Sequence, residues 1–230
     1  MSRAPNFSPL AHLYRWMEYL SFGPWLALTR SAFLDRLSDS RRALVLGDGD
    51  GRFTARLLGA NPTVQIDAID ASSAMLEQLL RRAGPHKSRV RILLADIRDW
   101  EAPAPIIAPP YDLVATHFFL DCLTTGEVEA LAGRLRGALA TSAIWIVSEF
   151  AVPPGWQGRL VARPLVAGLY LIFGWLTGLV VRTLPDHASA LRGAGFTLEE
   201  RRARLAGLLI SELWAAGPPN SPSHPVQARP

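Results

Sequence analysis

Hydrophobic and polar residues follow two different rhythms along this chain. Between residues 8 and 37 apolar side chains recur every three or four positions, as in "LAHLYRWMEYL", which predicts two helices. From residue 42 to residue 150, short apolar runs alternate with stretches of helical periodicity. Short strands that alternate with helices predict an α/β fold: an open, doubly wound, mostly parallel sheet with helices on both faces.

The predicted elements alternate regularly as far as Phe150. The strands are "RALVLGDG", "TVQIDAID", "SRVRILLAD", "YDLVATHFF" and "SAIWIVSEF", and the helices are "RFTARLLGA", "SSAMLEQLLRRAG" and "GEVEALAGRLRGALA". Beyond an apolar insert, "LPDHASALRGAGF" predicts a short helix with Asp186 as its N-cap. "FTLEERRARLAGLLISELWAA" predicts a C-terminal antiparallel hairpin that turns near Ala206 and Gly207.

These patterns divide the chain into three parts. Residues 1–40 form an N-terminal helical lid, residues 41–216 form the sheet domain, and residues 217–230 form a disordered Pro-rich tail. An apolar insert at about residues 153–184 interrupts the sheet domain as a second part of the lid. The length of 230 residues suits one such domain.

The insert contains "PLVAGLYLIFGWLTGLVV", an uncharged stretch from Pro164 to Val181 that approaches the length of a membrane span. It carries three glycines and lies between segments of one predicted sheet, so a span would place those segments on opposite sides of a bilayer. Buried or interfacial helices are therefore favoured. A peripheral membrane contact and a homodimer face remain as alternatives.

Composition indicates which class of partner and which cellular compartment to expect. The net charge of +4 comes from arginines scattered along the chain, which is typical of a solvated surface rather than of nucleic-acid binding. Cys122 is the single cysteine and no secretory signal is seen at the N-terminus, so a reducing cytoplasm is expected. The surroundings of Cys122 favour a small buried side chain and give no reason to expect a metal ligand.

Three glycines at alternate positions follow the first predicted strand in "ALVLGDGDGRF". A dinucleotide fingerprint would need its third glycine where Arg52 stands, and the two aspartates of the turn would repel a pyrophosphate. A nicotinamide-dependent oxidoreductase is therefore the weaker alternative, whereas a sulfonium cofactor with a free ammonium meets no such objection. The turn consists of Gly47, Asp48, Gly49, Asp50 and Gly51.

Acids at the ends of the next two strands fit the same ligand. Asp70 ends "QIDAID", about 20 residues past the glycines, where a carboxylate binds ribose hydroxyls, while Asp67 lies inside the strand. Asp96 ends the third strand, where it can accept a hydrogen bond from the adenine amino group with Ile97 beside the base.

With these motifs in order, residues 40–216 resemble the class I S-adenosylmethionine-dependent methyltransferases. The resemblance implies a Rossmann-like fold, S-adenosylmethionine as cofactor and S-adenosylhomocysteine as product. In that family the glycine turn wraps the methionine end of the cofactor, and an acid usually stands where this chain has Val45. Asp48 or Asp50 is then expected to neutralise the cofactor's ammonium. The implied cofactor-binding set is Gly47, Asp48, Gly49, Asp50, Gly51, Asp70, Ala71, Met75, Asp96, Ile97 and Thr116.

The acceptor is expected at the ends of strands four and five. His117 is the predicted general base because its ordinary pKa lies near neutrality, with Asp121 to orient it; a purely structural His117 is the alternative. An aromatic lid predicts a small apolar or aromatic acceptor with an O, N, S or C nucleophile. A lid that only packs on the core, in a non-catalytic or membrane-associated S-adenosylmethionine-binding protein, remains open. The predicted lining is Tyr14, Tyr19, His117, Phe118, Glu149, Tyr170 and Trp175.

Overall fold

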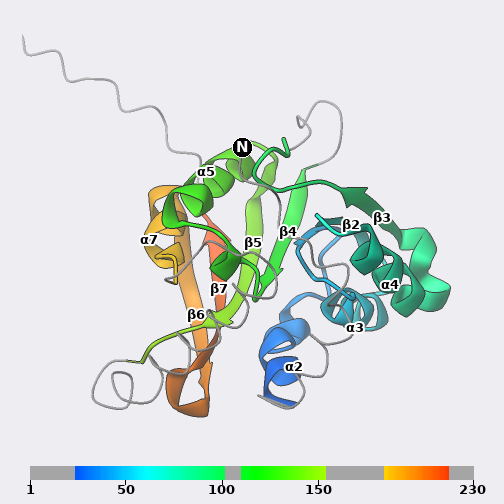
Figure 1. Cartoon of the computed structure of the whole chain (residues 1–230), viewed down its shortest axis with the longest axis horizontal. Helices are drawn as coiled ribbons and strands as arrows, with labels where there is room; N and C mark the ends of the chain where they lie inside the picture. The colour runs from blue at the N-terminus through cyan, green and yellow to red at the C-terminus, as the bar shows by residue number, and fades with distance from the viewer. Residues whose placement is uncertain (1–23, 102–109, 154–183, 218–230) are drawn as a thin grey trace, which may run out of the picture.

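A seven-stranded sheet runs through the centre of the protein (Figure 1). The computed structural model describes residues 24–101, 110–153 and 184–217. The strand order is β3-β2-β1-β4-β5-β7-β6. The strands are β1 (Arg42–Leu46), β2 (Gln65–Asp70), β3 (Val90–Leu94), β4 (Tyr111–His117), β5 (Leu139–Phe150), β6 (Phe196–Arg204) and β7 (Leu209–Ala216).

The sheet is parallel from β3 to β5 and antiparallel at β7. Strand β1 pairs in parallel with both β2 and β4, β4 pairs in parallel with β5, and β7 runs antiparallel to its two neighbours β5 and β6. The prediction of a mostly parallel, doubly wound sheet with a C-terminal hairpin is confirmed. The strand order reverses between β1 and β4. Open α/β sheets bind ligands at the carboxyl ends of the strands at such a point, so we call this part of the sheet the ligand-binding edge.

Helices cover both faces of the sheet (Figure 1). Apolar residues of α5 and α7 pack on one face around Trp145 and Trp214, and α3 and α4 pack on the other around Phe53 and Leu79. The helices and 3-10 turns are α2 (Pro24–Arg30), η2 (Leu34–Arg36), α3 (Arg52–Ala60), α4 (Ser73–Ala83), η3 (Gly84–Arg89), η4 (Leu120–Cys122), α5 (Thr125–Arg136), α7 (His187–Gly193) and η6 (Leu205–Gly207).

Burial on both faces explains the continuous apolar runs in the central strands. In β4, Leu113 and Ala115 face the layer of α3, whereas Val114 between them faces the layer of α5. A strand covered on both sides needs apolar residues at successive positions, which is why its sequence does not alternate.

The second predicted N-terminal helix is shorter than its sequence pattern indicates. Helix α2 ends at Arg30, and a turn and η2 follow where "GPWLALTRSAFLDRL" predicts continued helix. The backbone carbonyls of Ala27 and Thr29 accept hydrogen bonds from side chains of α3, β5 and β7. Tertiary contacts therefore satisfy the carbonyls at the helix end, and the helix can stop there.

The structure describes the predicted N-cap and hairpin but not every other predicted segment. Asp186 is the N-cap of α7, accepting the Ser189 N–H at 3.0 Å, as predicted. The hairpin turns through η6, with Ala206 at a positive φ of 54°. The first predicted helix, most of the insert and the tail lie outside the described residues. Within the described ranges, no helix is long and apolar enough to cross a membrane.

Candidate active site

The glycine turn between β1 and α3 places open backbone at the ligand-binding edge. Gly49 and Gly51 have φ angles of 57° and 80°, in the left-handed region that favours glycine. A Cβ at Gly51 would lie 2.7 Å from the Leu79 backbone, so this glycine lets α3 and α4 pack closely. A Cβ at Gly49 would meet only Met75 Sδ, at 3.9 Å. The backbone at Gly49 is therefore the part of the turn that a ligand can approach.

Asp48 holds the start of α3. Its carboxylate accepts the N–H groups of Phe53 at 3.2 Å and Thr54 at 2.8 Å. Burial raises the pKa of Asp48, and these bonds partly offset that rise. The carboxylate satisfies otherwise unpaired N–H groups at the helix N-terminus.

Asp50 is held by ion pairs. Its carboxylate lies 2.6 Å from a guanidinium nitrogen of Arg82 on α4 and 3.2 Å from Nε of Arg52 on α3. Protein groups therefore already bind both aspartates of the turn. This arrangement does not support the prediction that one of them neutralises the cofactor's ammonium in place of the acid missing at Val45.

Asp70 lies at the end of β2, directly beside the turn. Its carboxylate accepts the Ser72 N–H at 2.8 Å. Burial raises the pKa of Asp70 to about 6, although N–H groups of Ser72, Gly49 and Ala71 favour the charged form. The nearby charge of Asp48 raises the pKa further. The two features predicted to share a ligand, the Gly49 backbone and the Asp70 carboxylate, thus lie together.

The other acid of β2 has a different role. Asp67 is buried inside the strand and accepts hydrogen bonds from Tyr111 at 2.6 Å, Arg91 at 2.7 Å and Arg42 at 3.1 Å. Bonds to Arg91 and Tyr111 hold the pKa of Asp67 below its ordinary value despite burial. Asp67 therefore ties β1, β2, β3 and β4 together and is not available to a ligand.

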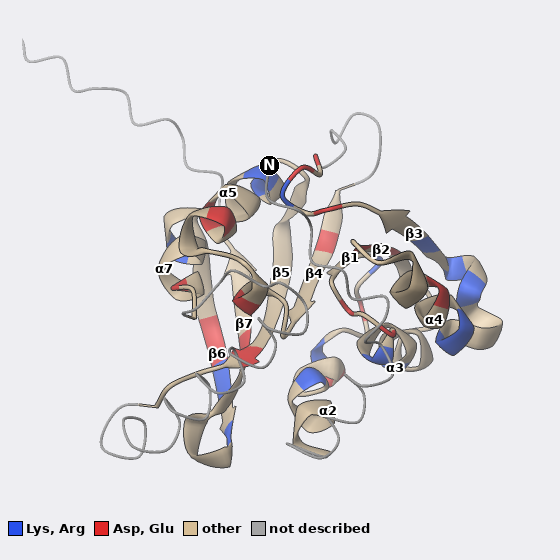
Figure 2. Cartoon of the chain, viewed as in Figure 1, with Lys and Arg blue, Asp and Glu red and all other residues tan. Residues whose placement is uncertain are grey.

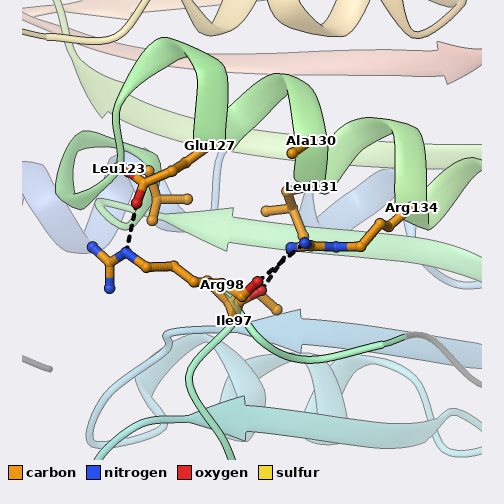
Figure 3. Close-up of a pocket in the computed structure, with 7 residues that line it drawn as sticks. All are labelled: Ile97, Arg98, Leu123, Glu127, Ala130, Leu131 and Arg134. Atoms are coloured by element: carbon orange, nitrogen blue, oxygen red, sulfur yellow. Dashed lines mark hydrogen bonds and ion pairs between the residues drawn. The ribbon is translucent and has the colours of Figure 1, made fainter. Parts of the chain in front are cut away.

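Asp96 and Ile97 follow β3 and connect it to α5. The Asp96 carboxylate accepts the backbone N–H of Arg98 at 3.0 Å and pairs with its guanidinium at 3.2 Å. Arg98 also donates to Glu127 of α5 at 2.7 Å (Figure 3). Ile97 is buried, and its carbonyl accepts from Arg134 of α5 at 2.7 Å. These contacts hold the predicted adenine-binding segment against α5.

A small cavity of about 70 Å³ lies between this segment and α5 (Figure 3). It is far smaller than the roughly 300–1,000 Å³ of typical ligand pockets. It therefore does not hold the cofactor by itself. Its lining residues are Ile97, Arg98, Leu123, Glu127, Ala130, Leu131 and Arg134.

Thr116, near the end of β4, points into the core. Its hydroxyl accepts the indole N–H of Trp145 at 3.0 Å, and the side chain is fully buried. This placement does not support the prediction that Thr116 contacts the cofactor. The hydroxyl instead satisfies an indole that would otherwise be buried without a partner.

His117 is also buried, on the opposite face of β4. Its Nδ1 lies 2.9 Å from Ser148 Oγ, and its ring centroid lies 4.2 Å from that of Phe53. Burial, and then the positive charge of Arg30, lowers the pKa of His117 to about 3. The imidazole is therefore neutral and a weak base near pH 7. This placement does not support the predicted general base.

His117 belongs to a polar network that sequence reasoning missed. Ser148 on β5 and Ser211 on β7 are 3.3 Å apart, and both hydroxyls lie within hydrogen-bond distance of the Thr29 carbonyl. The network docks the end of α2 onto β4, β5 and β7. No sequence signal links these groups, because 182 positions separate Ser211 from Thr29.

Two acids lie near the carboxyl ends of β4 and β5: Asp121 in η4, which follows β4, and Glu149 among the last residues of β5. Glu149 accepts the N–H groups of Phe119 at 3.1 Å and Leu120 at 2.8 Å, which fixes the start of η4. Burial and then the charge of Asp121 raise the pKa of Glu149 well above its ordinary value. Burial raises the pKa of Asp121 to about 6. Burial also raises the pKa of the Cys122 thiol, in accord with a small uncharged filler.

Apolar side chains surround the end of this edge. The rings of Phe118 and Phe150 are 5.2 Å apart, and both pack against a cluster from α2 and the start of β7. We call this surface the apolar floor. It consists of Leu26, Phe118, Phe150, Leu184, Leu208 and Leu209. The other predicted lining residues, Tyr14, Tyr19, Tyr170 and Trp175, lie outside the described residues.

Basic residues gather on one continuous part of the chain, from the end of α4 through η3 into β3. Figure 2 shows Lys and Arg concentrated on α4 and β3. Acidic neighbours offset part of this charge, because Arg82 pairs with Asp50 and Arg91 with Asp67. Among the residues the structure describes, no three His, Cys, Asp or Glu side chains group as a metal site would require.

Part of the chain is similar in sequence to a known protein family. Residues 44–144 match a family model described as a methyltransferase domain. This part of the chain is thus similar to methyltransferase domains, in agreement with the topology of the sheet. The prediction made from the glycine turn and the two strand-end acids is confirmed at the level of the family. No curated protein sequence is significantly similar to the chain.

Solved structures share the fold of the methyltransferase domain. Mitomycin 7-O-methyltransferase MmcR is similar with a TM-score of 0.67 and 17% identity, over 92% of this chain and 61% of that one. The S-adenosylmethionine-dependent methyltransferase SibL gives 0.65 and 22%, over 94% and 63%. The N-methyltransferase NodS from Bradyrhizobium japonicum gives 0.56 and 13%, over 84% and 97%. The chain thus spans less than two thirds of MmcR and SibL.

Proposed function

We propose that the protein transfers the methyl group of S-adenosylmethionine to a small, apolar or aromatic acceptor. The observation that carries the proposal is the pairing of the Asp70 carboxylate with the open backbone at Gly49. They lie at the edge of the sheet where open α/β folds bind nucleotides.

The residues at this edge fit S-adenosylmethionine in their chemistry. A carboxylate that is costly to keep charged when buried gains from two ribose hydroxyl donors and from a cationic ligand. Met75 Sδ and the Gly49 backbone would flank the nucleoside. Asp96 would accept from the adenine amino group in addition to its bonds with Arg98. When bound, the cofactor supplies a methyl group on an activated sulfonium.

The apolar floor supports an apolar acceptor. Its two rings and its leucines form an apolar cluster at the carboxyl ends of β4 and β5. Exclusion of water and alignment of two reactants lower the barrier of an in-line displacement. The acceptor atom is left open, since the structural relatives include both O- and N-methyltransferases.

Asp121 is the proposed proton acceptor if the nucleophile arrives protonated. Its pKa of about 6 lies close to neutrality, as proton transfer requires, and it stands at the carboxyl end of β4. The Asp121→Asn variant should lose turnover on a phenolic acceptor while keeping its affinity for S-adenosylhomocysteine. Unchanged turnover would mean that positioning alone carries the reaction.

Ligand-induced thermal stabilisation tests the cofactor. We expect S-adenosylhomocysteine to raise the melting temperature in proportion to the logarithm of its concentration above Kd, and NADH to leave it unchanged. A shift with NADH alone would favour the oxidoreductase alternative. Transfer of a labelled methyl group to a panel of phenols, quinols and amines then tests the enzyme. Binding without transfer to any acceptor would favour a non-catalytic S-adenosylmethionine-binding protein.

A further inference from the structure

Exposed apolar side chains gather at one end of the protein. Among the residues that the structure describes, five large apolar side chains are more than a third exposed. Four of the five belong to α2, to the segment after β5 and to the turn of the β6–β7 hairpin. Figure 1 shows α2 and this turn projecting at the same end of the sheet. We call these four residues the exposed apolar end: Trp25, Leu28, Val152 and Leu205.

The three segments are joined beneath these side chains. The backbone N–H of Ala151 donates to the carbonyl of Leu208 at 2.9 Å, which ties the end of β5 to the hairpin turn. Leu26 of α2 packs with Leu208 in the apolar floor. Trp25 and Leu28 are three positions apart, so they share one face of α2, whereas Leu26 is buried. The exposed apolar end is therefore continuous with the apolar floor and is not a set of isolated residues.

The hairpin turn exposes a leucine in an unfavourable backbone conformation. Leu205 and Ala206 have φ angles of 49° and 54°, in the left-handed region that residues other than glycine and asparagine rarely adopt. Glycine or asparagine would relieve this strain. Single exposed leucines are ordinary on a protein surface, but a strained one beside other exposed apolar side chains is typical of a binding surface.

The charge at this end favours an anionic partner. The segments that form it contain no Asp or Glu; they are residues 24–34, 150–153 and 203–211. Arg204 precedes Leu205 in the hairpin. Arg56 of α3 is exposed beside α2 and donates to a carbonyl of that helix at 2.8 Å. Arginines therefore border the exposed apolar side chains without acids between them.

The chain that leaves this end carries a long uncharged stretch. Pro153 lies beside the hairpin turn, and Leu184 packs against the apolar floor. The insert that connects these two residues has no charged residue from 164 to 181, and Arg163 and Arg182 flank that stretch. Apolar side chains bordered by arginines are typical of surfaces that lie in the headgroup region of a lipid bilayer.

We propose that the exposed apolar end docks the protein on the surface of a lipid bilayer with anionic headgroups. Trp25 and the three aliphatic side chains would enter the boundary between headgroups and acyl chains, and Arg56 and Arg204 would approach the phosphates. Because this end is continuous with the apolar floor, a lipid-soluble acceptor can pass from the bilayer to the carboxyl ends of β4 and β5. That last consequence rests on the proposed function, whereas the docking does not.

Co-sedimentation of the full-length protein with lipid vesicles, without any cofactor, tests the docking. We expect binding to vesicles of phosphatidylcholine and phosphatidylglycerol, and weaker binding to phosphatidylcholine alone. Leu205→Asn removes an apolar side chain and suits the positive φ, so the melting temperature should not fall. The vesicle affinity of this variant should fall about threefold to tenfold, and the double variant Trp25→Gln, Leu205→Asn should lose more than about tenfold.

Leu94→Asn is the matched control for Leu205→Asn. Leu94 is the fifth exposed apolar residue, 62% exposed, and it ends β3 at the opposite edge of the sheet from the hairpin. Its substitution should leave the vesicle affinity unchanged. Arg204→Gln should weaken binding to the anionic vesicles alone. Lys87→Gln, in the exposed basic segment of η3, should have no effect.

Three outcomes would overturn the proposal. The first is no vesicle binding by the unsubstituted protein, and the second is an equal loss in Leu94→Asn and Leu205→Asn. The third is a dimer that the double variant separates while vesicle binding stays unchanged, since that result would identify an interface between two copies of the chain. Because no cofactor is present, failure of docking leaves the proposed function standing. Failure of methyl transfer removes the route for the acceptor and leaves the docking standing.

Discussion

The two halves of the sheet differ in the partners that they provide for an acidic side chain, and the pKa values of the two acids shift in opposite directions. In the half that contains β1–β3, Asp70 is half-buried, its partners are backbone N–H groups and the negative charge of Asp48 lies nearby, and its pKa is raised to about 6. In the half that contains β5–β7, Glu212 is fully buried but is met by His187 at 2.9 Å, Arg201 at 2.5 Å and Trp214 at 3.0 Å. These bonds and charges hold the pKa of Glu212 below its ordinary value despite burial.

The difference separates a binding residue from a structural one. A hydrogen-bond donor or cation from a ligand stabilises the charged form of a carboxylate that has no positively charged partner in the protein. A carboxylate that already has such partners is stabilised little further by a ligand. Burial alone does not distinguish the two, since it raises the pKa of both acids. The partners of each acid distinguish them, and the following predictions test that distinction.

The largest expected effect is on stability, at Glu212. Glu212→Gln keeps the volume but removes the charge that His187 and Arg201 face, and we expect the free energy of unfolding to fall by about 3 kcal/mol in urea titrations. Because the folded pKa of Glu212 is lowered, the stabilisation it provides is present above its unfolded pKa. That stabilisation is lost as the pH falls through the folded pKa, so the variant should lose part of the acid sensitivity of the parent.

Glu200→Gln on the adjacent strand β6 is the control for Glu212→Gln. Glu200 forms a half-exposed pair with Arg202, so its substitution should change stability by less than about 1 kcal/mol. Equal losses of unfolding free energy in the two variants would show that Glu212 contributes no more to stability than the half-exposed Glu200.

The next effect is on binding, at Asp70. Asp70→Asn should weaken S-adenosylhomocysteine about 100-fold, because the amide loses charged hydrogen bonds to the ribose. The same change should keep or raise the melting temperature of the ligand-free protein, since it removes an uncompensated charge. Calorimetry and thermal melts measure the two effects separately.

Asp67→Asn, three residues earlier on β2, should give the reverse pattern. It removes the partner of Arg42, Arg91 and Tyr111, so the melting temperature should fall while the folded protein keeps its affinity. If Asp67→Asn rather than Asp70→Asn abolishes binding, the assignment of the two acids of β2 must be exchanged.

A smaller effect on the affinity for S-adenosylhomocysteine is expected when the pH is changed. Binding requires the charged form of Asp70, so affinity for S-adenosylhomocysteine should fall below the pKa of about 6, by roughly tenfold between pH 7 and pH 5. The stability of the ligand-free protein should change in the opposite sense. A raised pKa means that the contribution of Asp70 is fully present below its unfolded pKa and is lost as the pH rises through the folded pKa. Affinity that stays flat between pH 5 and pH 7 would contradict the role of Asp70.

The smallest effect is expected in the network that docks α2. Ser211→Ala removes one hydrogen bond to the Thr29 carbonyl, and we expect a loss of about 1 kcal/mol in the free energy of unfolding. Ser189→Ala, on α7 and outside this network, is the comparison and should leave the docking of α2 intact. A loss of S-adenosylhomocysteine affinity larger than the loss of stability would show that the position of α2 also serves binding.

Local patterns predicted those features that depend on neighbours in the sequence. The alternation of strands and helices, the turn at Gly47–Gly51 and the N-cap at Asp186 arise from periodicity and residue type within a few positions. The position of Asp70 at the end of β2 follows from the same local pattern, which is why the cofactor class could be predicted.

Residue type and periodicity are therefore enough to predict the doubly wound fold, the glycine turn and the acids at the strand ends. Which polar groups remain available to a ligand depends on tertiary contacts. Thr116 and His117 are adjacent in β4, yet Trp145 engages one on one face of the sheet and Ser148 engages the other on the opposite face. The partners of a side chain come from distant segments, and they set its burial, its charge and its pKa; a pattern of residue types along the chain does not contain them.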